Sequence, residues 1–109
     1  MEKDDVLLLR YIYDAIEQVE RYTRGMSESE FLSRTMVQDA AVRQIVVISD
    51  ATKNISAEFQ TVHPKLPWSK MIEIGKKTVP EDFSVNPASI WNIVQDELPL
   101  YKQAIKKLL

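Results

Sequence analysis

The chain contains no cysteine and only one histidine, His63, among its 109 residues. Without cysteine it can form neither a disulfide framework nor a metal site built on thiolates. A single imidazole per chain also excludes a site made from a cluster of histidines. These absences do not exclude a metal site made only of carboxylates. We predict no metal and no cofactor.

An excess of charge is also missing, because 14 Lys and Arg residues face 16 Asp and Glu residues and leave a net charge of −2. Broad electrostatic binding of nucleic acid usually needs a basic excess, although a local basic patch that contacts RNA stays open. No apolar run approaches the ~20 residues of a membrane-spanning helix, and residues 1–18 lack the pattern of a signal peptide. We therefore expect a cytoplasmic protein that does not bind membranes.

What the chain does contain is typical of one ordinary soluble domain. Hydrophobic residues make up 45% of it and charged residues 28%, which is neither a disordered nor a membrane composition. A chain of this length can bury one hydrophobic core. We predict a single domain over residues 1–109.

The longest stretch with one unbroken period is residues 34–59, and it contains neither glycine nor proline. Its apolar residues recur every three or four positions, with Thr52 filling the step between Ile48 and Ile55, which places them on one face of a long central helix. They are Val37, Ala41, Ile45, Ile48, Ile55 and Phe59. A second stripe carries Arg43 and Asp50, which we interpret mainly as a solvated face, with a partner-binding or site-lining face as the alternative.

Local signals divide the rest of the chain into further helices. Asp4 or Asp5 can cap a first helix that Gly25 ends. Ser27 and Glu30 have the spacing of a capping box, which opens a short helical turn. The prolines in residues 60–68 end the central helix.

A third helix of about two turns is expected to start at Trp68, with Gly75 as its weak point. Residues 75–84 are polar and aperiodic, which predicts a mobile loop or a frayed helix end. Asn86 and Pro87 give a strong start for the last helix, in which Pro99 predicts a kink or a restart. The fold class is therefore all-α, an antiparallel bundle of four to five helices.

Several short segments in this order resemble the HepT-like branch of the HEPN-domain family. They are residues 39–44 (DAAVRQ), 48–53 (ISDATK), 63–68 (HPKLPW), 83–86 (FSVN) running to Trp91, and Leu98-Pro99. The resemblance covers nearly the whole chain. It implies a helical bundle that forms homodimers, a toxin paired with a minimal nucleotidyltransferase antitoxin, and metal-independent RNA cleavage in the dimer cleft.

The catalytic motif of that family is missing from the window where the resemblance places it. The motif is an Arg, four to six residues, a His, one residue and a Tyr. Here Pro80 stands at the His position and Asp82 at the Tyr position. The Arg position falls on Gly75, or on Lys76 if the register slips by one. RNA cleavage needs a base to take the 2′-hydroxyl proton and a cation to hold the phosphate, so we predict that activity is lost or impaired.

Other residues could line a site or contact RNA. Lys76 and Lys77 can supply charge, although an ammonium replaces the fork of an arginine poorly. Asp50 either orients site residues or is a satisfied polar residue in a dimer interface, and Arg43 lies on the same stripe. His63 is interpreted as an exposed turn residue rather than a substitute base. Trp68 and Trp91 are interpreted as core residues rather than platforms for stacking bases.

Three hypotheses therefore stay open. The first is a HepT-like protein of a toxin–antitoxin pair whose nuclease motif is degraded. The second is an active ribonuclease with a replaced site, and the third is a purely structural helical interaction module. Val46 and Val47 widen the apolar arc of the central helix beyond what one neighbouring helix covers, so this helix lies either at the centre of the bundle or in a dimer interface. We also predict a homodimer, because the whole arc exceeds what one small bundle should bury.

Overall fold

In the computed structural model, which describes residues 2–81 and 84–109, every regular element is helical. The elements are α1 (Glu2–Thr23), α2 (Glu28–Leu32), α3 (Thr35–Lys53), α4 (Ala57–Val62), α5 (Trp68–Thr78), α6 (Pro87–Asn92), the π-helical turn η1 (Ile93–Glu97) and α7 (Leu98–Lys106). The predicted all-α class is confirmed. Among the described residues no helix is long and apolar enough to cross a membrane.

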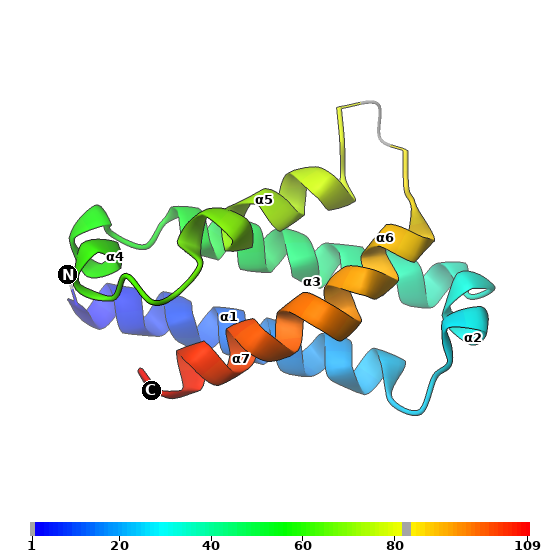
Figure 1. The fold of residues 1–109 in the computed structure, drawn as a ribbon, viewed down its shortest axis with the longest axis horizontal. Helices are drawn as coiled ribbons and strands as arrows, with labels where there is room; N and C mark the ends of the chain where they lie inside the picture. Colours follow the sequence, from blue (N-terminus) through cyan, green and yellow to red (C-terminus); the bar gives the residue numbers. More distant parts are fainter. Residues whose placement is uncertain (1, 82–83) are drawn as a thin grey trace.

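The bundle is organised around two long antiparallel helices, α1 and α3 (Figure 1). Helix α5 packs on α3, and the segment from α6 to α7 crosses back over α1. One continuous core joins these helices. The predicted apolar residues Ala41, Ile45 and Ile48 are fully buried in it, which explains why α3 lies at the centre of the fold.

Helix α1 begins at Glu2, so the prediction that Asp4 or Asp5 caps it is wrong. Asp5 lies inside the helix and is only 4% exposed. Its carboxylate accepts two hydrogen bonds from Ser56, one from the backbone N–H at 2.9 Å and one from Oγ at 2.8 Å. The aspartate therefore ties α1 to the start of α4, far along the chain. Gly25 has the predicted left-handed conformation after α1, with φ of 74°.

The predicted capping box is present at α2. The backbone N–H of Glu30 donates to Ser27 Oγ at 3.2 Å, and the backbone N–H of Ser27 donates to Glu30 Oε1 at 3.0 Å. This second bond lowers the pKa of Glu30, because it favours the charged carboxylate. Both orphan N–H groups at the start of α2 thereby gain partners.

The central helix is shorter than residues 34–59, because α3 ends at Lys53 and a separate helix α4 follows. Ser56 is extended, with φ of −60° and ψ of 147°, and its Oγ accepts from the N–H of Phe59. Serine competes with the helix for backbone groups, and here Asp5 also holds it in the capping conformation. The apolar residues keep the same spacing across this break, so their pattern did not reveal that α3 ends at Lys53.

Helix α5 runs to Thr78 and therefore includes the first four residues of the predicted loop, residues 75–78. The Val79 N–H donates to the Gly75 carbonyl, which closes the last turn. The loop interpretation was wrong for these four residues, which form the end of a helix, as the alternative interpretation allowed. Residues 82 and 83 lie outside the described part of the chain.

The last helix starts as predicted, because Asn86 Oδ1 accepts from the N–H of Ser89 at 3.1 Å and Pro87 follows the cap. The predicted irregularity near Pro99 takes the form of η1, where the Leu98 N–H donates to the Ile93 carbonyl, five residues back. A proline has no N–H and its ring crowds the carbonyl four residues back. A single wide turn just before Pro99 accommodates it without ending the helix.

Candidate functional site

The window where the resemblance places the catalytic motif spans the end of α5 and the loop after it (Figure 1). Gly75 faces α3 at very close range. A Cβ atom at this position would lie 2.5 Å from Ser49 Oγ and 2.7 Å from Ser49 Cβ. No side chain fits there without a shift of the two helices, so an arginine at position 75 is incompatible with this packing. Lys76, the alternative position for the arginine, is exposed.

Pro80 follows α5 and is half-buried, and it offers no group that could take a proton. Asp82, at the tyrosine position, lies outside the described residues. The only imidazole of the chain is at the opposite end of α5. That helix has 11 residues and is about 16 Å long. Within one chain His63 therefore cannot serve the window.

His63 is half-buried rather than exposed, which corrects the interpretation of it as a solvent-exposed residue. Its ring lies 4.4 Å from the ring of Phe59, centroid to centroid, and its carbonyl accepts from Trp68 Nε1 at 2.9 Å. Trp68 is buried, and Trp91 is half-buried against Phe31 at 5.2 Å. These contacts confirm that both tryptophans contribute to the core.

Arg43 and Asp50 lie on the exposed side of α3. Asp50 forms a salt bridge with Lys53 at 3.7 Å, one turn along the same helix, and both side chains are at least half exposed. Within the described part of the chain Arg43 has no salt bridge. The solvated-face interpretation fits both residues, since both are exposed and, in the described part of the chain, no salt bridge joins either of them to another helix.

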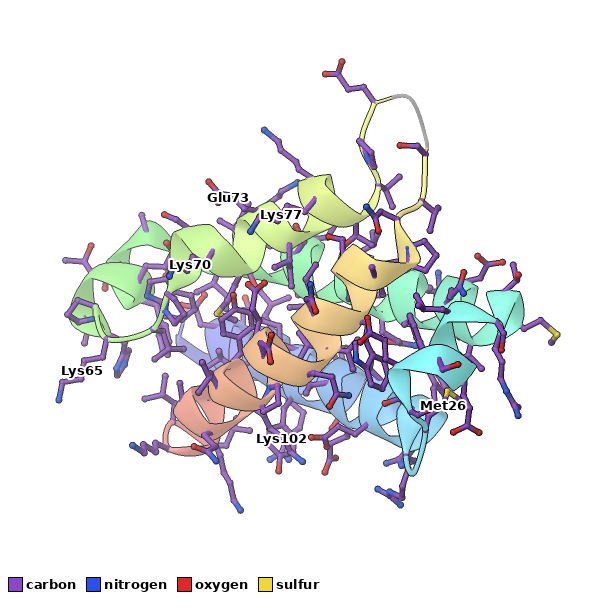
Figure 2. The ribbon with its side chains drawn as sticks, turned by 45° about the vertical axis from the view of Figure 1, so that its right-hand side comes forward. Met26, Lys65, Lys70, Glu73, Lys77 and Lys102 are labelled. Carbon is purple, nitrogen blue, oxygen red and sulfur yellow. The ribbon has the colours of Figure 1, made fainter. Side chains whose placement is uncertain are left out.

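Of the predicted site residues that the structure describes, Lys77 lines a groove between α5 and α7. The groove has a volume of about 530 Å³. The residues that line it are Lys65, Pro67, Lys70, Glu73, Lys77, Glu97, Leu100, Tyr101 and Ala104. Figure 2 shows Lys65 beside the start of α5, and Lys70, Glu73 and Lys77 along that helix. Positions 70, 73 and 77 share one helical face because they are three and four residues apart.

The inner wall of the groove contains a buried phenol. Tyr101 is 3% exposed, and its hydroxyl donates to Glu97 Oε1 at 2.7 Å. Burial, and then the hydrogen bond to Glu97, raise the pKa of Tyr101 far above its ordinary value of 10.0. The phenol therefore stays protonated at any ordinary pH, and it holds the Glu97 carboxylate against α7.

Metal binding finds no support in the described part of the chain, because it contains no group of three or more His, Asp or Glu residues that could hold an ion. The groove offers separate ammonium groups and two carboxylates, Glu73 and Glu97, of which Glu97 accepts from Tyr101. Ammonium groups bind anions rather than metals. The chemistry of this groove therefore favours an anionic ligand.

Comparison with known proteins gives a consistent result. The model of a family described as ribonuclease HepT-like matches residues 12–108. A Thermococcus cleftensis protein named "Probable ribonuclease HepT" is 33% identical over 100 residues, which are 92% of this chain and 91% of that protein. A Methanocaldococcus jannaschii protein, named as a gamma-glutamylcyclotransferase and putative RNase, is 31% identical over all 109 residues. This chain spans 49% of that protein's length. No solved structure matches the chain significantly.

Proposed function

The chain belongs to the HepT-like ribonuclease family, and from this premise we propose that it is the HepT-like member of a toxin–antitoxin pair in which RNA cleavage is lost or much slowed. The family membership supports the ribonuclease ancestry. The toxin–antitoxin role follows from the resemblance of the sequence to the HepT-like branch. The loss of activity rests on the chain's own residues.

The observation that carries the proposal is the composition of the motif window. The position of the base holds Pro80, and the first candidate position for the arginine holds Gly75, which is packed against Ser49. Cleavage of RNA by its own 2′-hydroxyl needs a proton acceptor near neutrality beside a cation that holds the phosphate. His63 lies before the start of α5, and that helix alone is about 16 Å long. One chain therefore supplies no imidazole to this window.

Lys76 is the best remaining candidate for the cation, because it is exposed and directly follows Gly75. An ammonium on a flexible stem can hold a phosphate, but it lacks the planar fork that binds two oxygens at once. The window can therefore contribute charge, but not the acid–base chemistry of an imidazole. This combination favours RNA contact over RNA cleavage.

We also propose that the protein forms a homodimer, binds a minimal nucleotidyltransferase antitoxin and works in the cytoplasm. Part of the apolar arc on α3 is buried within the chain, but Val46 and Val47 are only half-buried. On α1, Leu7 and Tyr11 are about half exposed. Burial of such residues between two copies is favourable. A dimer in light scattering, and a stable complex with the antitoxin on co-expression, would support these proposals, and a monomer at micromolar concentration would refute the first.

The test of the main proposal is an RNA-cleavage assay on the purified chain, with a chelator present and the Thermococcus cleftensis relative as the reference. We expect the chain to cleave at least about 100-fold more slowly, because acid–base help alone contributes 10²–10⁴-fold. A rate equal to that of the relative would favour the alternative, an active ribonuclease with a replaced site. A chain that neither cleaves nor binds RNA or the antitoxin would be a purely structural interaction module.

A further inference from the structure

A second hollow lies beside the groove between α5 and α7, at the end of the bundle. The second hollow has a volume of about 390 Å³ and lies between the turn after α4 and the end of α7. Lys65 and Ala104 line both, so the groove and the hollow are adjacent, and together they are called the depression. The second hollow is lined by apolar surface from Val62, Pro64 and Leu108, and Val62 is 67% exposed.

Four lysines line this depression. Lys77, Lys70 and Lys65 follow one another along α5 and the turn before it (Figure 2), and Lys107 lines the second hollow. None of the four forms a salt bridge with a residue that the structure describes. Lys102, by contrast, pairs with Glu20 at 2.7 Å and Glu17 at 3.8 Å. The ammonium groups along the depression are therefore available to a ligand.

We propose that this depression binds single-stranded RNA, with phosphates of the backbone on Lys65, Lys70 and Lys77 and a base in the apolar hollow beside Leu108. The proposal rests on the proposed function, because RNA is the polyanion on which a ribonuclease family acts. A basic groove that follows the backbone, beside rings on which bases stack, is the general design of single-strand binding sites. In the second hollow the ring is that of His63, and Val62, Pro64 and Leu108 add apolar surface beside it. Because the net charge of the chain is −2, its overall charge does not attract RNA, and a local row of lysines has to supply the attraction.

Glu73 supplies an internal check on the proposal. It lies between Lys70 and Lys77 on the same face of α5 and lines the same groove. A carboxylate beside a bound phosphate is repulsive, so its removal should strengthen the binding of RNA. Glu97 has less effect, because the buried Tyr101 hydroxyl donates to it. A protein partner with acidic side chains would use the lysines in a similar way, but would not release the counterions condensed on a phosphate backbone, whose release makes the binding of nucleic acid steeply dependent on salt.

The experiment measures binding of a fluorescein-labelled single-stranded RNA by anisotropy at several salt concentrations. The RNA carries 2′-O-methyl groups, so it cannot be cleaved and binding is measured separately from any nuclease activity. The groove variant is Lys65→Gln/Lys70→Gln/Lys77→Gln. The control is Arg10→Gln/Arg21→Gln/Lys106→Gln, which removes the same charge from exposed residues outside the depression.

We expect the groove variant to bind more than about tenfold more weakly at low salt, and the slope of log K against log salt to flatten by about 2, since each phosphate contact contributes about 0.7 for single strands. The control should change binding only slightly. Glu73→Gln should tighten binding about two- to fivefold, a gain that partial unfolding cannot produce. Equal losses in the groove and control variants, or an unchanged slope, would overturn the inference and leave the proposed loss of cleavage untouched.

Discussion

The packing of Gly75 against Ser49 leads to a prediction that runs against helix propensity. Alanine is a better helix former than glycine by roughly 0.5–1 kcal/mol, so Gly75→Ala in an isolated α5 would stabilise the helix. In the bundle, the added methyl group would lie 2.5 Å from Ser49 Oγ and 2.7 Å from Ser49 Cβ. Both distances are well below van der Waals contact, so α3 and α5 would have to separate.

Ser49 cannot simply rotate away. Its side chain is buried, and its hydroxyl donates to the Ile72 carbonyl at 2.5 Å. Rotation would break that hydrogen bond, which contributes about 1 kcal/mol, and would leave the Cβ contact in place. Overpacking a core by a methyl group costs about 1–3 kcal/mol. With the lost hydrogen bond added and the gain in propensity subtracted, we expect Gly75→Ala to lower the free energy of unfolding by about 1–3 kcal/mol.

Urea denaturation followed by circular dichroism measures this change. Lys76→Ala is the matched control, because it changes the next and exposed residue of α5 and should alter stability by less than about 0.5 kcal/mol. In a Ser49→Gly background the clash is gone, so Gly75→Ala should there be neutral or stabilising. If Gly75→Ala is as stable as the wild type in the Ser49 background, the close approach of α3 and α5 is wrong and position 75 can hold the arginine.

Three further predictions concern two links between helices and the end of α5. Asp5→Ala should lower the free energy of unfolding by about 2–3 kcal/mol in urea melts, because the two hydrogen bonds from Ser56 lose their charged acceptor; an unchanged midpoint would refute this. The hydrogen bond to Glu20 raises the pKa of Lys102 above 10.5, so stability from this pair is present below that pH and is lost as the pH rises through the folded-state pKa. The stability difference between wild type and Lys102→Met, up to about 1 kcal/mol, should therefore shrink above pH ~10.5. Amide exchange should show residues 76–78 protected like the rest of α5.

Local signals in the sequence were sufficient wherever a helix end depends on residues close in the chain. Gly25, the Ser27–Glu30 box and the Asn86 cap each act within one turn, so their spacing alone predicts them. The end of α3 and the role of Asp5 were not predictable in this way. Asp5 and Ser56 are 51 residues apart and meet only because α1 and α3 pack antiparallel.

The same reasoning explains what was missed at the candidate site. Lys77 was predicted from its place beside the motif window, whereas Lys65, Lys70 and Tyr101 were not. Tyr101 lines the same groove only because α7 returns beside α5, a consequence of the tertiary fold. The spacing of Lys70, Glu73 and Lys77 already indicates that they share one face of a helix. This was missed because residues 75–78 were interpreted as a loop or a frayed helix end, so Lys77 was not placed on the same helix as Lys70. Gly75 was interpreted as a weak point of a helix, although it is a position of close packing.

The central claim is that RNA cleavage is lost because the motif window lacks its base, its arginine and its phenol. The most direct test compares the cleavage rates of the unmodified chain and the variant Lys76→Arg/Pro80→His/Asp82→Tyr, once both are shown by light scattering and circular dichroism to have the same assembly and helicity. Arginine is placed at position 76 because position 75 is closed by Ser49. We predict that the variant cleaves at least about 100-fold faster. If the unmodified chain degrades RNA as fast as the variant, the claim is wrong and another site must hold the activity, with Lys76, Lys77 and Asp50 the first residues to test.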